Sequence, residues 1–248
     1  MAVVAPLCLL VVLLVGWWAF TTFSPVESWV MPTPADYLRR CGQLLPQAWF
    51  WERMLITAGE ALAGSLAGAL VALPLAYAIY RVRIVQAAVE PFLGATQAIP
   101  AIALAPLLVL WVGYGIAPIV TLCALTVFFP ILVSTTVALR QLPKEILEAA
   151  ELDGADGWTM AASMEIPLAA PGILGGLRNG FTLSITGAIV GEMVMGGTGL
   201  GQILTQQRNN LDTAGMFVTL SVLCAMAMTL YVIIYRIEKS QRFRDLRG

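Results

Sequence analysis

Two glutamates lie inside apolar stretches of this sequence, where a carboxyl group is expensive to place. Glu60 interrupts the apolar segment 54–80, and Glu192 lies near the end of the segment 168–195. A carboxylate in lipid costs about 3 kcal/mol on insertion scales, so Glu60 should face another helix or an aqueous path. Two interpretations follow for both glutamates: a structural hydrogen bond inside a helix bundle, or a role in lining a transport path, where a carboxyl group could carry protons.

Other chemically reactive patterns are lacking. The sequence has no histidine, and its cysteines show no metal-ligand spacing, being scattered at Cys8, Cys41, Cys123 and Cys224. These features exclude zinc sites and histidine-based acid–base catalysis, and we expect no metal or cofactor in this chain. The glycine-rich segment 196–201, GGTGLG, lacks the Lys and Ser or Thr of a phosphate-binding loop. We interpret it as a compact turn outside a membrane, and we expect no ATP binding or enzymatic activity from this chain.

The composition is that of an integral membrane protein. Hydrophobic residues make up 59% of the 248 positions and charged residues only 12%, whereas soluble domains carry about 25% charged residues. No basic stripe is present, so nucleic acid is not an expected partner. We expect the lipid bilayer to be the main surrounding of the chain.

The apolar segments predict an all-α bundle of about six membrane-spanning helices, because a span needs about 20 apolar residues. The third segment contains Pro91, Pro100 and Pro106, which predict kinks, and Gln97 could line a pathway there. We divide the chain into an N-terminal helix with an extracytoplasmic loop (1–53), a core (54–239) and a basic tail (240–248). The six predicted spans are 2–23, 54–80, 84–112, 116–139, 168–195 and 213–235.

Glycines recur at four-residue spacing on two of these spans, which indicates close helix packing. Gly64 and Gly68 follow Glu60 on one face of the second span, and the fifth span carries Gly172, Gly176 and Gly180.

The basic residues orient the bundle. Ten fall on one side of the predicted topology and four on the other, so the positive-inside rule places both termini in the cytoplasm. The inner set is Arg81, Arg83, Arg140, Lys144, Arg178, Arg236, Lys239, Arg242, Arg244 and Arg247, and the outer set is Arg39, Arg40, Arg53 and Arg208.

The longest segment that no membrane could hold is 143–167, PKEILEAAELDGADGWTMAASMEIP, which predicts a cytoplasmic helix–turn–helix hairpin. Pro143 suits a helix start, the strong helix formers 144–152 follow, and Gly154 can end the helix with a positive φ. Asp156 could cap a second short helix that stops before Pro167. An apolar ridge with acidic flanks fits a groove on another protein, although such a hairpin could also lie along a membrane surface.

The hairpin carries a family resemblance. Glu148, Ala149, Ala150, Gly154 and Pro167 resemble the EAA motif of permease subunits of bacterial binding-protein-dependent ATP-binding-cassette (ABC) importers, although Met164 and Ile166 replace the usual Ile and Leu. Four more blocks are similar to the nitrate/sulfonate/taurine branch, which also holds thiamine-pyrimidine and riboflavin-type permeases. These blocks are QAIPAIALAPLLVLWVGYG (97–115), FFPILV (128–133), PGILGGLR (171–178) and GEMVMGGTGLG (191–201).

The resemblance implies a type I, MetI-like permease fold in the bacterial inner membrane. It also implies that two copies pair across their glycine-rich helices, and that two separate ATPase subunits, which hold ATP and Mg²⁺, grip the hairpins. The loop with Gly197, Gly199 and Gly201 would meet an extracytoplasmic binding protein. Glu60, Gln97, Arg178 and Glu192 are our candidates for the translocation path.

Two other classes remain open at this point: a secondary transporter driven by an ion gradient, with Glu60 or Glu192 carrying protons, and a scaffold subunit of a membrane enzyme. The solute is open as well. Arg178 is the only obvious cation within the spans, which favours a small neutral or zwitterionic organic compound over a strongly anionic one.

Overall fold

The structure, a computed structural model, describes residues 4–24, 27–96 and 100–245, and in that part it is helical and has no strand. The elements follow one another as α1 Val4–Phe23, α2 Pro34–Leu44, α3 Ala48–Arg81, α4 Arg83–Thr96, α5 Ala101–Val112, α6 Ile116–Arg140, α7 Lys144–Leu152, α8 Gly157–Met160, the π-helical turn η1 Ala161–Glu165, α9 Ile166–Met195, α10 Leu200–Asn209 and α11 Thr213–Asp245.

Among the described residues, four helices are long and apolar enough to cross a membrane: 48–81, 116–140, 157–195 and 213–239. Two shorter apolar segments, 11–23 and 102–112, lie where the sequence predicted the first and third spans. The chain is therefore a multi-pass membrane protein. The helix α11 continues to Asp245, so most of the predicted tail 240–248 is the end of a helix.

The third predicted span is not one kinked helix. The structure has two helices there, α4 ending at Thr96 and α5 beginning at Ala101, with Pro100 in extended conformation (φ −65°, ψ 119°) at the start of α5. Proline supplies no N–H for a helical hydrogen bond, which fits the place of Pro100 directly before the first residue of α5. Gln97 lies outside the described residues.

The hairpin between α6 and α9 has the predicted first helix, 144–152. Gly154 follows with φ of +90°, and the N–H groups of Gly154 and Ala155 close the helix end by donating to the carbonyls of Glu151 (3.0 Å) and Ala150 (2.9 Å). This pair of bonds is a Schellman motif, which favours glycine at the positive-φ position.

The second arm of the hairpin differs from the prediction. It does not stop before Pro167 but continues as one 39-residue helix from Gly157 to Met195. The turn η1, 161–165, lies directly before Pro167, which occupies the first turn of α9. A π turn shifts the backbone hydrogen bonds by one residue, so the helix can continue although proline has no N–H to donate. Asp156 precedes α8, but its side chain makes no capping hydrogen bond.

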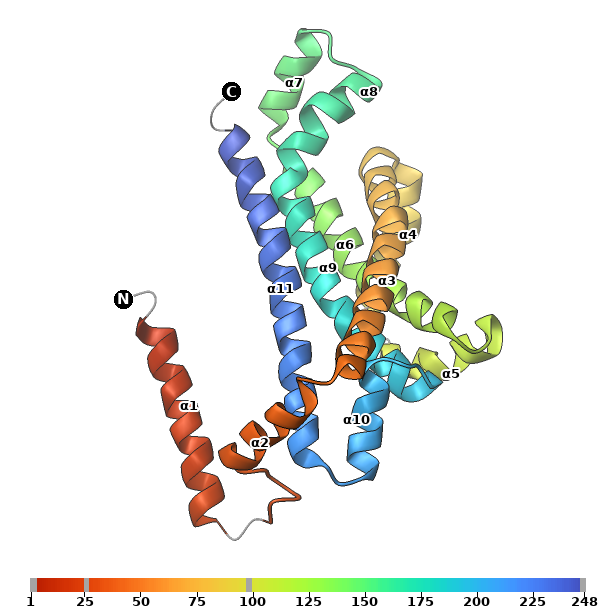
Figure 1. Cartoon of the computed structure of the whole chain (residues 1–248). Coiled ribbons are helices and arrows are strands. Elements are labelled where there is room, and N and C mark those ends of the chain that lie inside the picture. The colour runs from red at the N-terminus through yellow and green to blue at the C-terminus, as the bar shows by residue number, and fades with distance from the viewer. Residues whose placement is uncertain (1–3, 25–26, 97–99, 246–248) are drawn as a thin grey trace.

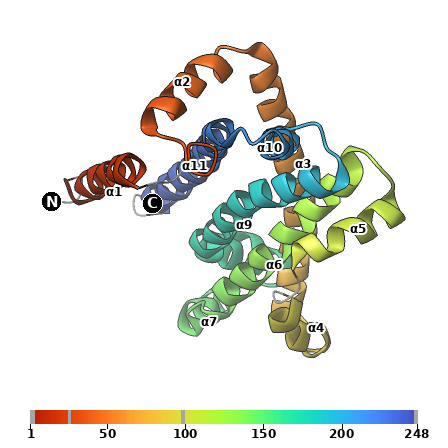
Figure 2. The same cartoon turned by 90° about the horizontal axis from the view of Figure 1, so that it is seen from below.

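The bundle has two distinct ends. In Figure 1, α7, α8 and the C-terminal part of α11 lie at the top, which we call the hairpin end, while α2 and α10 lie at the opposite end, which we call the loop end. Viewed from below, α6 and α9 lie at the centre and α1 at the periphery beyond α11 (Figure 2). The helix α10, which was not predicted from the sequence, begins at Leu200, within the GGTGLG segment.

Small residues let α6 contact both α3 and α9 closely. A Cβ on Gly68 would lie 2.7 Å from the carbonyl oxygen of Ala124, and one on Gly176 would lie 2.7 Å from Cβ of Ser134. Gly64, Gly172 and Gly180 meet α6 in the same way. These glycine faces therefore pack inside the chain against α6, and the pairing of two copies stays a prediction.

Candidate functional site

A buried cluster around Glu192 fastens the loop end. The Glu192 side chain is 1% exposed, and its oxygens accept hydrogen bonds from the Thr57 hydroxyl (2.6 Å) and from the N–H of Gly201 (2.5 Å). The Thr57 oxygen also accepts from the N–H of Leu200 at 2.8 Å. These donors include free N–H groups of the first turn of α10, where a negative charge is favoured.

The glycines of the predicted binding-protein loop surround this carboxylate. A Cβ on Gly197 would lie 2.7 Å from Glu192 Cγ, one on Gly201 would lie 2.6 Å from the carbonyl oxygen of Ile189, and one on Gly199 would overlap Thr57 and Glu192. Packing against a buried acid thus requires the small residues here. In the structure their immediate role is to let the loop close over Glu192.

Glu60 lies against the same cluster. It is 3% exposed, and neither of its carboxyl oxygens has a hydrogen-bond partner among the described residues. Its neighbour Glu192 interacts with it directly, but two ionised carboxylates have only acceptors to offer each other. A hydrogen bond between them therefore requires one of the two to carry a proton.

A third buried acid lies at the hairpin end. Glu165, the last residue of η1, is 1% exposed. Its Oε2 accepts hydrogen bonds from Tyr77 Oη at 2.9 Å and from Arg81 Nη2 at 3.0 Å, and Arg81 Nε donates to Tyr77 Oη at 3.0 Å. From the sequence, Arg81 served only to orient the bundle, Glu165 was only a position within the EAA-like segment, and Tyr77 had no assigned role. A signal was present, because Glu165 lies four residues before Ala169 and eleven before Gly176, in line with the buried face of α9 if the helix is continued through Pro167.

The tip of the hairpin presents apolar side chains to its surroundings. Leu152 is 89% exposed and Trp158 is 80% exposed, while Ala150 is buried against the second arm. Glu148 and Ala149 are exposed on α7. The predicted coupling residues therefore include two at the surface and one that holds the hairpin together.

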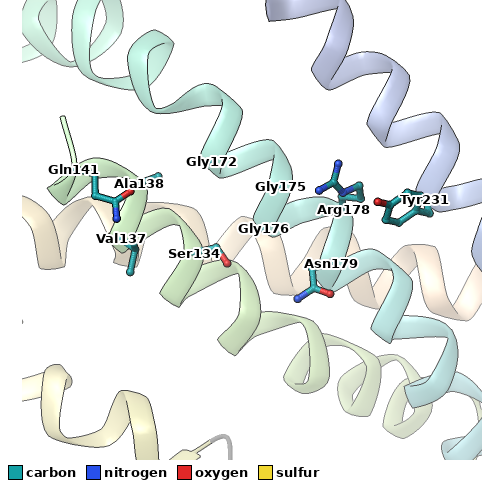
Figure 3. Close-up of a pocket in the computed structure, with 10 residues that line it drawn as sticks. All are labelled: Ser134, Val137, Ala138, Gln141, Gly172, Gly175, Gly176, Arg178, Asn179 and Tyr231. Carbon is teal, nitrogen blue, oxygen red and sulfur yellow. The ribbon is translucent and has the colours of Figure 1, made fainter. Parts of the chain in front are cut away.

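An open cavity of about 470 Å³ lies between α6, α9 and α11. Figure 3 shows Arg178 and Asn179 of α9, Ser134 and Gln141 of α6 and Tyr231 of α11 around it. Arg178 Nη1 donates to Glu238 Oε2 of α11 at 2.6 Å, and its Cζ lies 4.9 Å from the centre of the Tyr231 ring. The cation is thus neutralised, and the remaining polar groups at the cavity are uncharged.

The four candidates for the translocation path do not form one site. Glu60 and Glu192 lie together at the loop end, whereas Arg178 precedes Glu192 by fourteen positions on α9, which corresponds to about 21 Å along a helix. Gln97 lies outside the described residues.

Comparison with known proteins identifies the family of this chain. Residues 64–242 match the family of binding-protein-dependent transport system inner membrane components. A riboflavin transport system permease protein of Chloroflexus aurantiacus is 40% identical over 93% of this chain and 86% of its own length. A formylaminopyrimidine transport permease protein of Halalkalibacterium halodurans is 34% identical over 62% of each chain. The taurine transport system permease protein of Escherichia coli is 24% identical over 94% of this chain and 84% of its own.

Solved structures show the same fold. A chain of the MetNI methionine ABC transporter in an inward-facing conformation superposes with a TM-score of 0.69 at 19% identity, over 79% of this chain and 98% of the other. A chain of an amino acid ABC transporter gives a TM-score of 0.67 at 16% identity, over 83% and 98%. These matches leave no support for a gradient-driven carrier. The chain belongs to the family of inner membrane components of binding-protein-dependent transport systems, as a permease subunit of an ABC importer.

Proposed function

We propose that this permease forms the path for a small, uncharged, nitrogen-containing heterocycle of the riboflavin or pyrimidine class. The observation that carries this choice is the 40% identity with a riboflavin permease over 93% of the chain, against 24% with a taurine permease. Nitrate- and sulfonate-like solutes, which the sequence left open, are the weaker alternative.

The cavity beside Arg178 supports the same class of solute. A sulfonate or nitrate would gain most from an unpaired cation, but Glu238 already pairs with Arg178 at 2.6 Å. Ser134, Gln141 and Asn179 offer hydroxyl and amide groups, which suit the donors and acceptors of a neutral heterocycle. An exposed amide on a spanning helix is costly in lipid, so Asn179 favours a polar route or a partner helix at this face.

We further propose that the hairpin is the docking element for the ATPase. Its apolar residues Leu152 and Trp158 are exposed and lie beside acidic residues in the sequence, and such a ridge fits a groove on a soluble partner. ATP and Mg²⁺ then belong to that partner, and this chain hydrolyses nothing.

The remaining assembly follows from the sequence-based topology. The hairpin end faces the cytoplasm together with both termini, and the loop end, with α10 and the glycine loop, faces an extracytoplasmic binding protein. Two copies of the permease enclose the route. Because α6 covers the glycine-rich faces inside each chain, the copies pair through other surfaces.

The test is competitive uptake in cells that lack their own riboflavin uptake system and express this permease with its ATPase and binding protein. We expect labelled riboflavin or formylaminopyrimidine to enter and unlabelled taurine not to compete. Uptake of taurine or nitrate with no uptake of either heterocycle would overturn the assignment. A companion variant is Glu238→Gln, which removes the carboxylate that pairs with Arg178. In this variant we expect anionic solutes to compete better with labelled riboflavin.

A further inference from the structure

The helix α3 is attached by hydrogen bonds near both of its ends, to the hairpin at one end and to the glycine loop at the other. At the hairpin end, Arg81 and Tyr77 hold Glu165 at 3.0 and 2.9 Å. At the loop end, Thr57 holds Glu192 at 2.6 Å and Arg53 Nη1 donates to the carbonyl oxygen of Thr198 at 2.5 Å.

The two attachment points are far apart but lie on one continuous element. Thr57 and Arg81 are 24 positions apart within the single helix 48–81, which corresponds to about 36 Å at 1.5 Å per residue. Between them, Gly64 and Gly68 pack α3 closely against α6. A helix that packs tightly along its length transmits displacement, because such an interface shifts between discrete arrangements and does not deform continuously.

The hairpin has room to move relative to this attachment. A cavity of about 300 Å³ separates Arg81 from the turn, and it is lined by Arg81, Glu151, Gly154, Ala155, Asp156, Gly157 and Met160. The helix α7 packs against α8 and η1. A force on the hairpin tip therefore reaches the bundle through η1 as well as through the junction with α6, and Glu165 is the buried acid at the end of η1.

We propose that Glu165 is a positioning residue that couples the hairpin to α3, and that α3 carries the displacement to the glycine loop through Thr57 and Glu192. The proposal rests on the proposed docking of the ATPase at the hairpin. A buried carboxylate that loses its partners is strongly disfavoured, so Glu165 and Arg81 move together. ATP-driven movement of the hairpin thereby alters the surface at the loop end, and a partner bound at that surface acts back on the ATPase, since coupling is reciprocal.

The experiment follows the loop end while the nucleotide state changes at the other end. Leu211, in the turn between α10 and α11, is 64% exposed and accepts a spin label as Leu211→Cys in a chain whose native cysteines are replaced. The full complex with its ATPase is reconstituted in liposomes, and the spectrum is compared without nucleotide and with Mg²⁺-ATP and vanadate.

We expect a nucleotide-dependent spectral change in the native background, reduced by about fivefold or more in Glu165→Gln and Arg81→Gln. The matched control is Arg83→Gln, an exposed arginine two residues along the chain, which should keep the full change. The double variant Arg81→Glu with Glu165→Arg should restore part of it, which a general loss of stability would not do. If Glu165→Gln gives no monodisperse protein, Tyr77→Phe removes one donor without changing the packing, and a partial reduction is expected.

Two kinds of failure are distinguishable. A preparation that retains no ATPase with the native hairpin contradicts the proposed function itself. A preparation that retains the ATPase, but in which Glu165→Gln and Tyr77→Phe leave the spectral change at its native size, contradicts the role of Glu165 alone. The same holds if the native complex shows no change at Leu211.

Discussion

The hydroxyl of Thr57 joins three helices through Glu192. It donates to Glu192 Oε1 at 2.6 Å and accepts from the N–H of Leu200 at 2.8 Å, so one oxygen atom connects α3, α9 and the start of α10. All of these atoms are buried. A buried polar group is costly without a partner, so these hydrogen bonds hold the start of α10 against α3 and α9.

Thr57→Val should destabilise the permease because it removes both hydrogen bonds of the Thr57 hydroxyl. The substitution preserves shape but leaves the N–H of Leu200 and one oxygen of Glu192 without partners, at about 1–3 kcal/mol. Thermal unfolding in detergent measures the change. The control is Thr121→Val, because the Thr121 hydroxyl is exposed and donates to the carbonyl of Ala117 in its own helix (2.8 Å). Equal melting temperatures for the two variants would contradict the structural role of Thr57.

Gly199→Ala should disrupt the loop end, since its Cβ would overlap Thr57 Oγ1 and Glu192 Oε1. Overpacking of this kind costs about 1–3 kcal/mol. Gly175→Ala is the counterpart in α9, where a Cβ would meet nothing within 4 Å and alanine is favoured in a helix by about 1 kcal/mol. We expect the first variant to melt at a lower temperature than the native chain and the second at an equal or higher one. The reverse order would show that the loop is not closed over Glu192.

The same substitution should have different effects on stability at Glu60 and at Glu192. Glu60→Gln introduces N–H donors beside an acceptor-only neighbour, and neither oxygen of Glu60 has a partner to lose among the described residues. Glu192→Gln instead brings an N–H group toward the donors Thr57 and Gly201, at about 1–3 kcal/mol. Melting curves should therefore show Glu60→Gln as stable as the native chain, and Glu192→Gln less stable.

Uptake by Glu60→Gln separates the two interpretations of Glu60. A structural acid allows uptake to continue when the amide replaces the carboxyl group, because the amide N–H can donate to the Glu192 carboxylate. A residue that carries protons in transport cannot be replaced in this way. We expect at least half of native uptake, and a stable variant without uptake would assign Glu60 to the transport step.

The sequence predicted those elements whose signals are local. The first hairpin helix, 144–152, begins after Pro143 and ends before Gly154, and the structure has these bounds, because a proline start and a glycine stop act within one turn. The span ending at Met195 was found for the same reason, since Gly196 follows it with a φ of +80°.

Features set by tertiary contacts were missed. Pro167 reads as a helix stop, but the π turn before it allows the helix to continue, and only a continuous helix places Glu165 beside Tyr77 and Arg81. The separation of α4 from α5 could not be told from a kink by composition. Glycine stripes identify close packing but not the partner, which proved to be α6 of the same chain.

Gly154 provides a test of the hairpin that does not depend on the solute. Its φ of +90° is unfavourable for residues with a side chain. Asparagine and aspartate tolerate such a backbone better than the others do. Gly154→Val should strain the turn by about 1–2 kcal/mol or more and displace Leu152 and Trp158, while insertion into the membrane is unaffected. Gly154→Asn is the matched control, because asparagine tolerates a left-handed backbone and no atom lies within 4 Å of its Cβ position. Purification of the tagged chain should recover the ATPase with the native protein and with Gly154→Asn, and much less of it with Gly154→Val. Equal recovery with all three would show that binding of the ATPase does not depend on the conformation of this turn.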